Sequence, residues 1–394
     1  MKNLYKSLII CTLVALISVS TSYNVLAGNR DRSGQAGASH LMIDPWAHTS
    51  GFANAGVAEI RGLESVYSNV AGLSFVKKTE FAFNRTQYLV GSNCGININS
   101  MAFAQHLGRA KDFGTIGLSF FSMGFGDIER TTVGQPEGGL GTFSPSLTYI
   151  GIHYAKKFNH FIQGGATVKI INESISDAHA MGFAIDAGIQ YTAGAFDNFR
   201  IGVTLKNIGL PMSYKGDGLA ARGVAVGTSF EQTLQSRSAE FEMPSLLTVG
   251  VSYDFLFFGG EYAEMSKDDR KEMGLTRDEA MHRITLMGAF TANSYSRDIF
   301  AVGLEYAFMN YFMVRGGYSL ESFTKKTSTD YTTNEVVSTI LVNGDSFFLG
   351  PSVGATAVVP LKKGNTGARI YLDYAYRFTS KWRGNHLMGI KITL

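Results

Sequence analysis

Residues 368–378 read Ala-Arg-Ile-Tyr-Leu-Asp-Tyr-Ala-Tyr-Arg-Phe, and large apolar side chains occupy every second position from the third onward. Successive side chains of a β-strand point to opposite sides of the sheet. One face of a strand formed here therefore carries Ile370, Leu372, Tyr374, Tyr376 and Phe378. The opposite face carries Arg369, Asp373 and Arg377. A strand with one apolar face and one charged face is typical of a transmembrane β-barrel with a polar interior.

The same alternation recurs along the chain, for example at 182–192, 200–206 and 247–255. A bilayer offers no hydrogen-bond partner to a free strand edge, so such strands must close on themselves. We predict an all-β fold, a transmembrane antiparallel β-barrel of about 14 strands, over residues 79–394. The predicted strands are 79–89, 96–107, 114–123, 147–157, 161–172, 181–193, 198–208, 245–257, 282–293, 298–308, 311–321, 346–361, 367–378 and 384–394.

The composition agrees with a barrel and argues against other membrane or nucleic-acid-binding classes. The chain has 45 Gly, 28 Phe and 18 Tyr, with 17% charged residues. After the N-terminal signal-like segment, no apolar run reaches the ~18 residues of a transmembrane helix. A soluble β-sandwich would expose polar rather than apolar outward faces. The net charge of +3 gives no basic footprint for nucleic acid.

Residues 1–27 have the layout of a secretory signal peptide. Lys2 and Lys6 form a positive start, residues 8–19 are mostly apolar, and cleavage is expected after Ala27. Removing both lysines lowers the formal charge from +3 to about +1. Only Cys94 of the two cysteines then remains, which excludes an internal disulfide. Export together with the barrel pattern predicts the outer membrane of a Gram-negative bacterium.

The lengths of the connections suggest which way the barrel points. Barrels of this kind have short periplasmic turns and longer outer loops. The long connections 124–146, 209–244 and 322–345 follow strands that run outward, and the short turns 158–160, 309–310 and 362–366 follow strands that run inward.

The charged stretch 258–281 breaks this pattern, because it is a long connection on the periplasmic side. It is either a solvated excursion or a docking element for a periplasmic partner. Ser266 followed by Asp269 predicts a capped short helix within it.

Residues 28–78 alternate poorly and are rich in Gly and Ala, so we expect an N-terminal plug that folds back into the barrel. Its plug motif is Asn69, Val70, Ala71 and Gly72, followed by Leu73. This stretch resembles the Asn-Pro-Ala-Gly-Leu sequence that closes the plug of FadL-type barrels. Val70 stands where those proteins have proline, which makes the turn less rigid.

A closer resemblance is to the PorV (LptO) branch of that superfamily, and it covers most of the chain after residue 27. It is carried by residues 37–41, 44–47, 57–64, 69–73, 125–129, 136–139, 141–145, 216–218, 241–245 and 315–318. It implies a non-enzymatic outer-membrane component of the type IX secretion system. Such a component receives cargo with a C-terminal signal domain from a SprA-like translocon and passes it to an attachment complex with a PorU-like sortase. The PorQ branch shares the fold.

Two sets of residues are candidates for function. The outer loops combine charges with aromatic residues, as protein interfaces do, and an unpaired strand edge there could accept a strand of the cargo. The expected cargo-binding residues are Phe125, Asp127, Glu129, Arg130, Phe143, Arg222, Phe230, Arg237 and Phe241. The expected lumen charges are Glu305, Arg315, Arg369, Asp373 and Arg377, which form either a paired internal network or a selective pore lining.

The sequence contains no enzyme motif in the structural context that the motif requires. Residues 350–354, Gly-Pro-Ser-Val-Gly, match a nucleophile elbow, but that motif needs a strand, a sharp turn and a helix, and here a strand continues. The histidines lack the spacing of metal ligands, and no cofactor is expected. Three hypotheses remain: a secretion carrier, a FadL-like transporter of hydrophobic small molecules with an apolar pocket beside the plug, and a lipid-modifying enzyme with a Ser–His or paired-carboxylate site.

Overall fold

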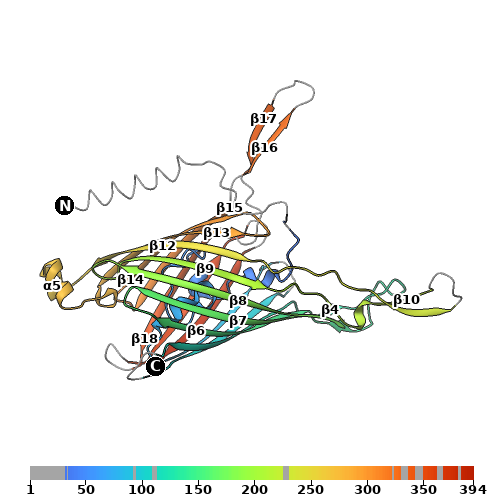
Figure 1. The fold of residues 1–394 in the computed structure, drawn as a ribbon, viewed down its shortest axis with the longest axis horizontal. Coiled ribbons are helices and arrows are strands. Elements are labelled where there is room, and N and C mark those ends of the chain that lie inside the picture. The colour runs from blue at the N-terminus through green and yellow to red at the C-terminus, as the bar shows by residue number, and fades with distance from the viewer. Residues whose placement is uncertain are drawn as a thin grey trace.

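Fourteen antiparallel strands form a closed barrel in this computed structural model (Figure 1). The structure describes residues 32, 34–91, 95–108, 113–224, 230–321, 324–329, 336–341, 349–361, 367–379 and 383–394. The barrel strands are β1 (Thr79–Gln87), β2 (Asn97–His106), β3 (Thr115–Gly124), β6 (Ser146–Lys157), β7 (Ile162–Ile175), β8 (Ala178–Ala193), β9 (Phe199–Gly209), β12 (Leu246–Phe257), β13 (His282–Asn293), β14 (Ile299–Phe308), β15 (Phe312–Glu321), β18 (Gly350–Pro360), β19 (Arg369–Arg377) and β20 (Asn385–Thr393). The predicted fold class and strand number are confirmed.

The barrel closes where β1 pairs with β20, with Phe83 opposite Ile390. The alternation seen in the sequence sets which side chains face outward. Along β8, Phe183 and Ile189 are exposed on the outside, whereas Asp186 is buried on the inside. The outer surface is thus apolar and the interior polar, the reverse of a soluble protein.

The residues before β1 pack inside the barrel (Figure 1). We call residues 34–76 the N-terminal segment. It contains η2 (Ser39–Met42), α2 (Ala47–Ser50), α3 (Ser65–Ser68) and η3 (Val70–Phe75). Among the described residues, no helix has the length and apolar character needed to cross a membrane.

The N-terminal segment runs from one end of the barrel to the other. Near its start, the Gly37 amide donates to the Glu242 carbonyl, 2.9 Å away, in the long connection between β9 and β12. At its finish, it leads directly into β1 at the end where the short turns lie. Small wall residues leave room for its bulky side chains. Ala82, Ala102 and Ala155 of the wall surround a cluster that includes Trp46 and Leu73.

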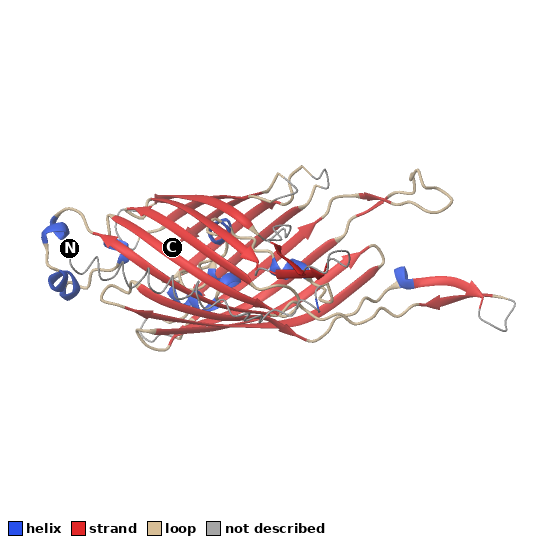
Figure 2. Cartoon of the chain, turned by 90° about the horizontal axis from the view of Figure 1, so that it is seen from above, coloured by secondary structure: helices blue, strands red, loops and turns tan. Residues whose placement is uncertain are grey.

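The three long connections carry hairpins beyond the end of the barrel (Figure 2). They are β4 (Ile128–Glu129) with β5 (Thr142–Phe143), β10 (Ala220–Val224) with β11 (Glu231–Gln235), and β16 (Thr324–Thr329) with β17 (Val336–Leu341). A 3₁₀ turn, η4 (Asp217–Leu219), precedes β10. The sequence predicted long loops at these places but not their strands. The predicted turn 362–366 lies outside the described residues.

The charged stretch 258–281 folds at the opposite end as α4 (Glu261–Glu264), α5 (Lys267–Glu272) and η5 (Arg277–Glu279) (Figure 1). We call it the helical excursion. The predicted cap is confirmed, because the Asp269 amide donates to Ser266 Oγ at 3.1 Å and the Ser266 amide donates to the Asp269 carboxylate at 3.3 Å.

The Gly-Pro-Ser-Val-Gly motif lies within strand β18, as expected, and the described residues after it form strands rather than a helix. Ser352 faces the interior, where its hydroxyl donates to the Gly51 carbonyl of the N-terminal segment at 3.3 Å. The geometry of a nucleophile elbow is therefore not formed.

Candidate functional site

The interior of the barrel carries more buried positive than negative charges on its strands. Seven strand cations are buried: Lys169, Arg200, Lys206, Arg283, Arg315, Arg377 and Lys391. Five strand carboxylates are buried: Glu173, Asp186, Asp254, Glu305 and Asp373. Glu80 of β1 is only partly buried but also faces inward, where it accepts from the Leu63 amide at 2.8 Å, and Arg277 adds a further buried cation from the connection between β12 and β13. Eight cations against six carboxylates leave an excess of two positive charges. The N-terminal segment has three acids, Asp44, Glu59 and Glu64, against Arg61, an excess of two negative charges. The segment thus supplies the counter-charge that the wall lacks.

Glu59 is the most heavily paired acid of the N-terminal segment. Its carboxylate accepts from Arg277 Nη2 at 2.5 Å and also pairs with Arg200. Arg200 in turn holds Asp254 with two nitrogens, at 2.9 and 2.7 Å. Two parallel N–H···O bonds of this kind are among the stronger polar contacts in proteins. Burial lowers the pKa of Arg277, but Asp254 and Glu59 outweigh that effect and hold the pKa above its usual range.

A second charged cluster lies around His48 and contains most of the expected lumen charges. Arg315 Nε bonds Glu305 at 3.1 Å, and Arg315 Nη1 lies 3.5 Å from Asp373. His48 lies 3.6 Å from Asp373 and 3.9 Å from Glu305. Arg377 is also buried and faces inward, with Arg377 Nη2 3.3 Å from the Ser319 hydroxyl.

Arg369 differs from the other expected lumen charges. It is partly exposed at the first position of β19, and its side chain makes no ion pair with the described residues.

The His48 cluster has the distances of a metal site but not the charge. Ligand atoms of His48, Glu64 and Asp373 lie within 4.8 Å of one another. However, Lys391 Nζ is already 2.5 Å from Glu64, and Arg315 is beside Asp373. These fixed cations neutralise the carboxylates, so a divalent ion gains little there. The cluster joins the segment to the wall without one.

The plug motif is buried where the N-terminal segment crosses strand β8. Asn69 begins η3, and its side chain donates to the carbonyls of Val57 at 3.0 Å and Ile189 at 3.1 Å. Val70 and Ala71 are buried, and the Gly72 amide closes the turn onto the Asn69 carbonyl at 3.0 Å.

Strand glycines let the N-terminal segment approach the wall closely. A Cβ on Gly202 would lie 2.5 Å from the Val57 carbonyl oxygen, and a Cβ on Gly317 would lie 2.3 Å from the Phe52 carbonyl carbon. Both neighbours are backbone atoms, which cannot rotate away. These positions therefore require glycine as long as the segment is seated.

Gly202→Ala should weaken the packing of the N-terminal segment against the barrel wall, because the backbone at Val57 must move. We expect a loss of about 1–3 kcal/mol, as for other overpacked sites, measured as a lower thermal midpoint of the folded barrel in detergent. Gly288→Ala is the control, since a Cβ there meets nothing within 4 Å. Equal midpoints for the two variants would contradict the close approach.

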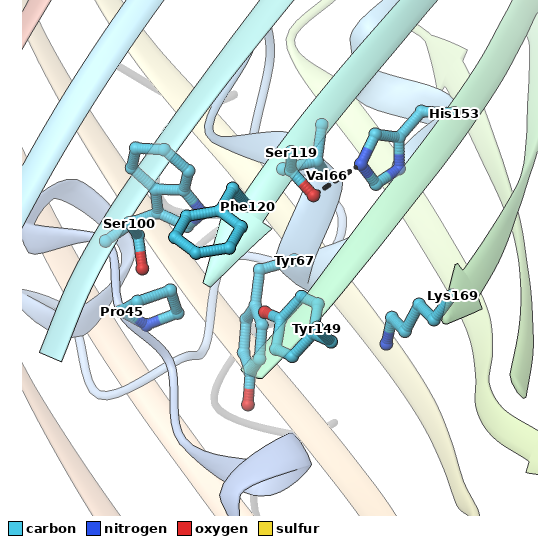
Figure 3. Close-up of a pocket in the computed structure, with 10 residues that line it drawn as sticks. Pro45, Val66, Tyr67, Ser100, Ser119, Phe120, Tyr149, His153 and Lys169 are labelled. Carbon is cyan, nitrogen blue, oxygen red and sulfur yellow. Dashed lines mark hydrogen bonds between the residues drawn. The ribbon is translucent and has the colours of Figure 1, made fainter. Parts of the chain in front are cut away.

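A small cavity lies between the N-terminal segment and the wall, next to a Ser–His pair (Figure 3). His153 Nε2 is 2.8 Å from Ser119 Oγ, and His153 Nδ1 is 2.8 Å from Thr167 Oγ1. Sequence reasoning found no such pair, because the residues lie on three strands. The cavity measures about 10 Å³, about enough for one water molecule. It lies under Trp46 and Tyr67, so the pair is a poor candidate for catalysis.

The structure divides the expected cargo-binding residues into two groups. Phe125 and Phe241 pack against the interior cluster that contains Leu41 of the N-terminal segment. Arg222 and Phe230 are instead exposed on the β10–β11 hairpin, as is Arg237 just after it.

The expected residues of the β4–β5 hairpin bind within that hairpin and to the neighbouring strand turn. Arg130 donates to Ser176 Oγ at 2.9 Å, and Glu129 accepts from the Gly139 amide at 2.9 Å. Asp127 accepts from the Ser144 hydroxyl. Phe143 is half-buried and pairs with Ile128 across the hairpin.

Sequence reasoning missed the strongest links between the segment and the wall. Arg200 and Asp254 lie in the alternating stretches 200–206 and 247–255 and face inward, but the alternation does not identify Glu59 as a partner of Arg200. Glu59 and Arg277 are 218 positions apart, so no local pattern joins them. The one available signal was the short charged group Glu59, Arg61 and Glu64 within a stretch that is otherwise free of Asp, Glu, Lys and Arg.

Neither a protein-family model nor a curated protein sequence matches this chain. The Pseudomonas putida toluene transporter TodX has a similar fold, with a TM-score of 0.47 at 13% identity over 88% of this chain and 96% of TodX. The Ralstonia pickettii toluene transporter TbuX has a TM-score of 0.46 at 12% identity over 88% and 97% of the two chains. A Pseudomonas aeruginosa FadL homologue has a TM-score of 0.47 at 12% identity, again over 88% and 97%.

The likeness is one of barrel architecture. At these TM-scores and sequence identities, the similarity assigns neither a family nor a substrate to this chain. The PorV resemblance stays a prediction, because the similar structures named above are two transporters and a FadL homologue.

Proposed function

We propose that this protein is a non-enzymatic barrel of a bacterial outer membrane. The support is the outward face of its strands, which carries large exposed apolar side chains such as Phe183, Ile189 and Leu372. Such a surface is stable in lipid and would aggregate in water. Closure of all fourteen strands leaves no unpaired edge in the barrel, as a bilayer requires.

The N-terminal segment is proposed to act as a plug that closes the barrel at rest. Its charges complement the wall, and its backbone lies against the strand glycines. The two cavities described beside it measure about 10 and 20 Å³, whereas a pocket for a small organic ligand measures about 300–1,000 Å³. A working surface outside the lumen is therefore the better candidate.

The proposed working surface is the set of hairpins at the long-loop end. On the PorV resemblance, it binds exported cargo as the cargo leaves a SprA-like translocon, and it delivers that cargo to an attachment complex with a PorU-like sortase. The observation that carries this proposal is the β10–β11 hairpin, which extends beyond the barrel (Figure 1) and exposes Val224, Phe230 and Leu234. Exposed apolar groups on a protruding hairpin suit a protein partner better than a diffusing solute.

A second candidate function is the passage of small hydrophobic molecules across the outer membrane. The names of the similar solved structures favour it, since TodX and TbuX are toluene transporters. It requires the N-terminal segment to move, because the described cavities beside it are too small for such a molecule.

Purification of the intact protein from its native membrane should separate the two candidates. We expect a large translocon subunit or a surface protein to co-purify in near-equal amount, and the yield of that chain to fall when Phe230 is changed to Ser. Bound hydrophobic small molecules without a protein partner would reject the first candidate and support the second. Met273→Ser is the control, because Met273 is an exposed apolar residue of the helical excursion at the opposite end of the barrel.

A further inference from the structure

One residue of the helical excursion reaches into the barrel. Arg277 is only 7% exposed, although it belongs to a connection outside the strands. Its Nη2 bonds Glu59 of the N-terminal segment at 2.5 Å, and its Nε lies 3.6 Å from Asp254 of β12. The excursion, the segment and the wall therefore meet at a single guanidinium group.

The part of the excursion that carries Arg277 is anchored to the end of the barrel. Leu275 and Ala280 on either side of it are buried. Asn310, in the turn between β14 and β15, donates to the Asp278 carbonyl at 3.1 Å. Thr276 caps η5 together with Glu279, whose carboxylate accepts from the Thr276 amide at 2.7 Å. These contacts fix the position from which Arg277 enters the lumen.

The rest of the excursion contacts the barrel through Phe258, whose ring lies 5.6 Å from that of Phe196 in the turn between β8 and β9, and otherwise binds mainly to itself. Arg270 donates to the carbonyls of Tyr262 at 2.7 Å and Ala263 at 2.9 Å. Its guanidinium lies 5.3 Å from the centre of the Phe258 ring. Helix α5 lies beyond the end of the barrel, away from the strands (Figure 1). The excursion is thus fastened in the lumen through Arg277, while its helix α5 projects beyond the barrel.

We propose that the helical excursion is a latch that holds the N-terminal segment in place through Arg277 and Glu59. Arg200 has a second carboxylate partner, Asp254, which it keeps with or without the segment. Arg277 contributes the additional positive charge that makes burial of the Glu59 carboxylate favourable. Withdrawal of Arg277 leaves Glu59 with one shared cation and opens space under the Gly56–Ile60 turn. Displacement of the excursion from the short-turn end therefore releases the segment.

This proposal rests on the plug role of the N-terminal segment, and its test uses the full chain reconstituted in planar lipid bilayers. Wild type should be closed nearly all the time. Arg277→Met removes the charge and keeps an apolar stem of similar length, so it should raise the open probability by about tenfold or more. Arg270→Met is the matched control, because it alters the excursion without touching the lumen, and it should stay closed.

Glu59→Gln provides a second route to the same result, since it removes the other charge of the pair with little change of shape. It should also open the barrel, and the double variant with Arg277→Met should open it no further than the stronger single variant, because the two residues act through one contact. Heat-modifiable migration on gels verifies that each variant is folded.

Two outcomes would overturn the latch. If a chain lacking residues 34–76 conducts while folded Arg277→Met and Glu59→Gln stay as closed as wild type, the latch is wrong and the plug stands. If the truncated chain inserts but does not conduct, the plug role fails, and the latch fails with it.

Discussion

Deleting residues 34–76 should give a barrel that still closes but conducts ions continuously, whereas the intact chain stays shut. Barrels of eight strands are filled by their own side chains, and barrels of about 16 strands leave an aqueous channel. The inward faces of the fourteen strands carry small residues such as Ala102 and Gly202 where the segment packs, so its removal leaves that space unfilled. The measurement is single-channel current in a planar bilayer. If a truncated chain that is shown to be folded passes current only in brief, occasional openings, the plug role is contradicted.

The current of the truncated chain should also favour anions. Once the three acids of the segment are gone, the seven buried strand cations and Arg277 face six inward carboxylates, Glu80 included, and a lumen with an excess of one sign concentrates the opposite ion. The reversal potential in a salt gradient reports this preference. Changing Lys391 to Gln and Arg377 to Gln in the truncated chain removes two of those cations and should abolish it.

The same truncation bears on the second candidate function. A transporter of hydrophobic molecules needs the segment to move, so the truncated chain should admit such molecules without control. A secretion component should instead leak while its cargo binding at the long-loop end persists. If the truncated chain does not fold, the double variant Gly202→Ala with Gly317→Ala takes its place, because it displaces the segment without removing it.

The alternation of the sequence was sufficient to predict the barrel, because burial in a barrel strand depends on parity alone. At 368–378 it placed Asp373 inside and Tyr374 outside, and the structure gives 7% and 42% exposure for these two residues. Strand ends shifted by a few residues, since hydrogen bonding rather than side-chain pattern decides where a strand stops. The hairpin strands β10 and β11 were missed because neither of their faces is buried in lipid or core.

The pairing of charges could not be predicted, because parity says that a side chain faces the lumen and not which partner it meets there. Arg315 and Glu305 become neighbours through the register of β14 and β15, which a sequence alone does not fix. Arg369 has inward parity in the sequence, yet it lies at the first position of its strand and is half-exposed. Glu59 and Arg277 meet only because two connections of unknown shape converge on the wall pair Arg200 and Asp254.

Replacing the β10–β11 hairpin, residues 220–235, with a short Gly-Ser turn should abolish cargo delivery while the barrel stays folded. The hairpin is a two-stranded sheet of its own, and no strand among the described residues pairs with its outer edges. Unpaired edges accept strands from a β-rich partner. Its exposed apolar side chains, such as Phe230 at 61%, would lie against that partner. Secretion of surface proteins should fall by about tenfold or more, the effect expected when an aromatic anchor is lost.

The point variants Phe230→Ser and Leu234→Ser should reproduce much of this loss, because they remove the apolar contact and keep the backbone. Phe125 is a less suitable target, since its ring packs on the interior cluster and its loss would also disturb the N-terminal segment. Secretion is followed as the amount of cargo at the cell surface, with barrel abundance measured in the same membranes. Unchanged secretion by the hairpin replacement at normal abundance would exclude this surface. Unchanged secretion together with uptake of a small hydrophobic molecule that depends on movement of the segment would favour the transport function. Transport needs no partner at the hairpins, whereas secretion does.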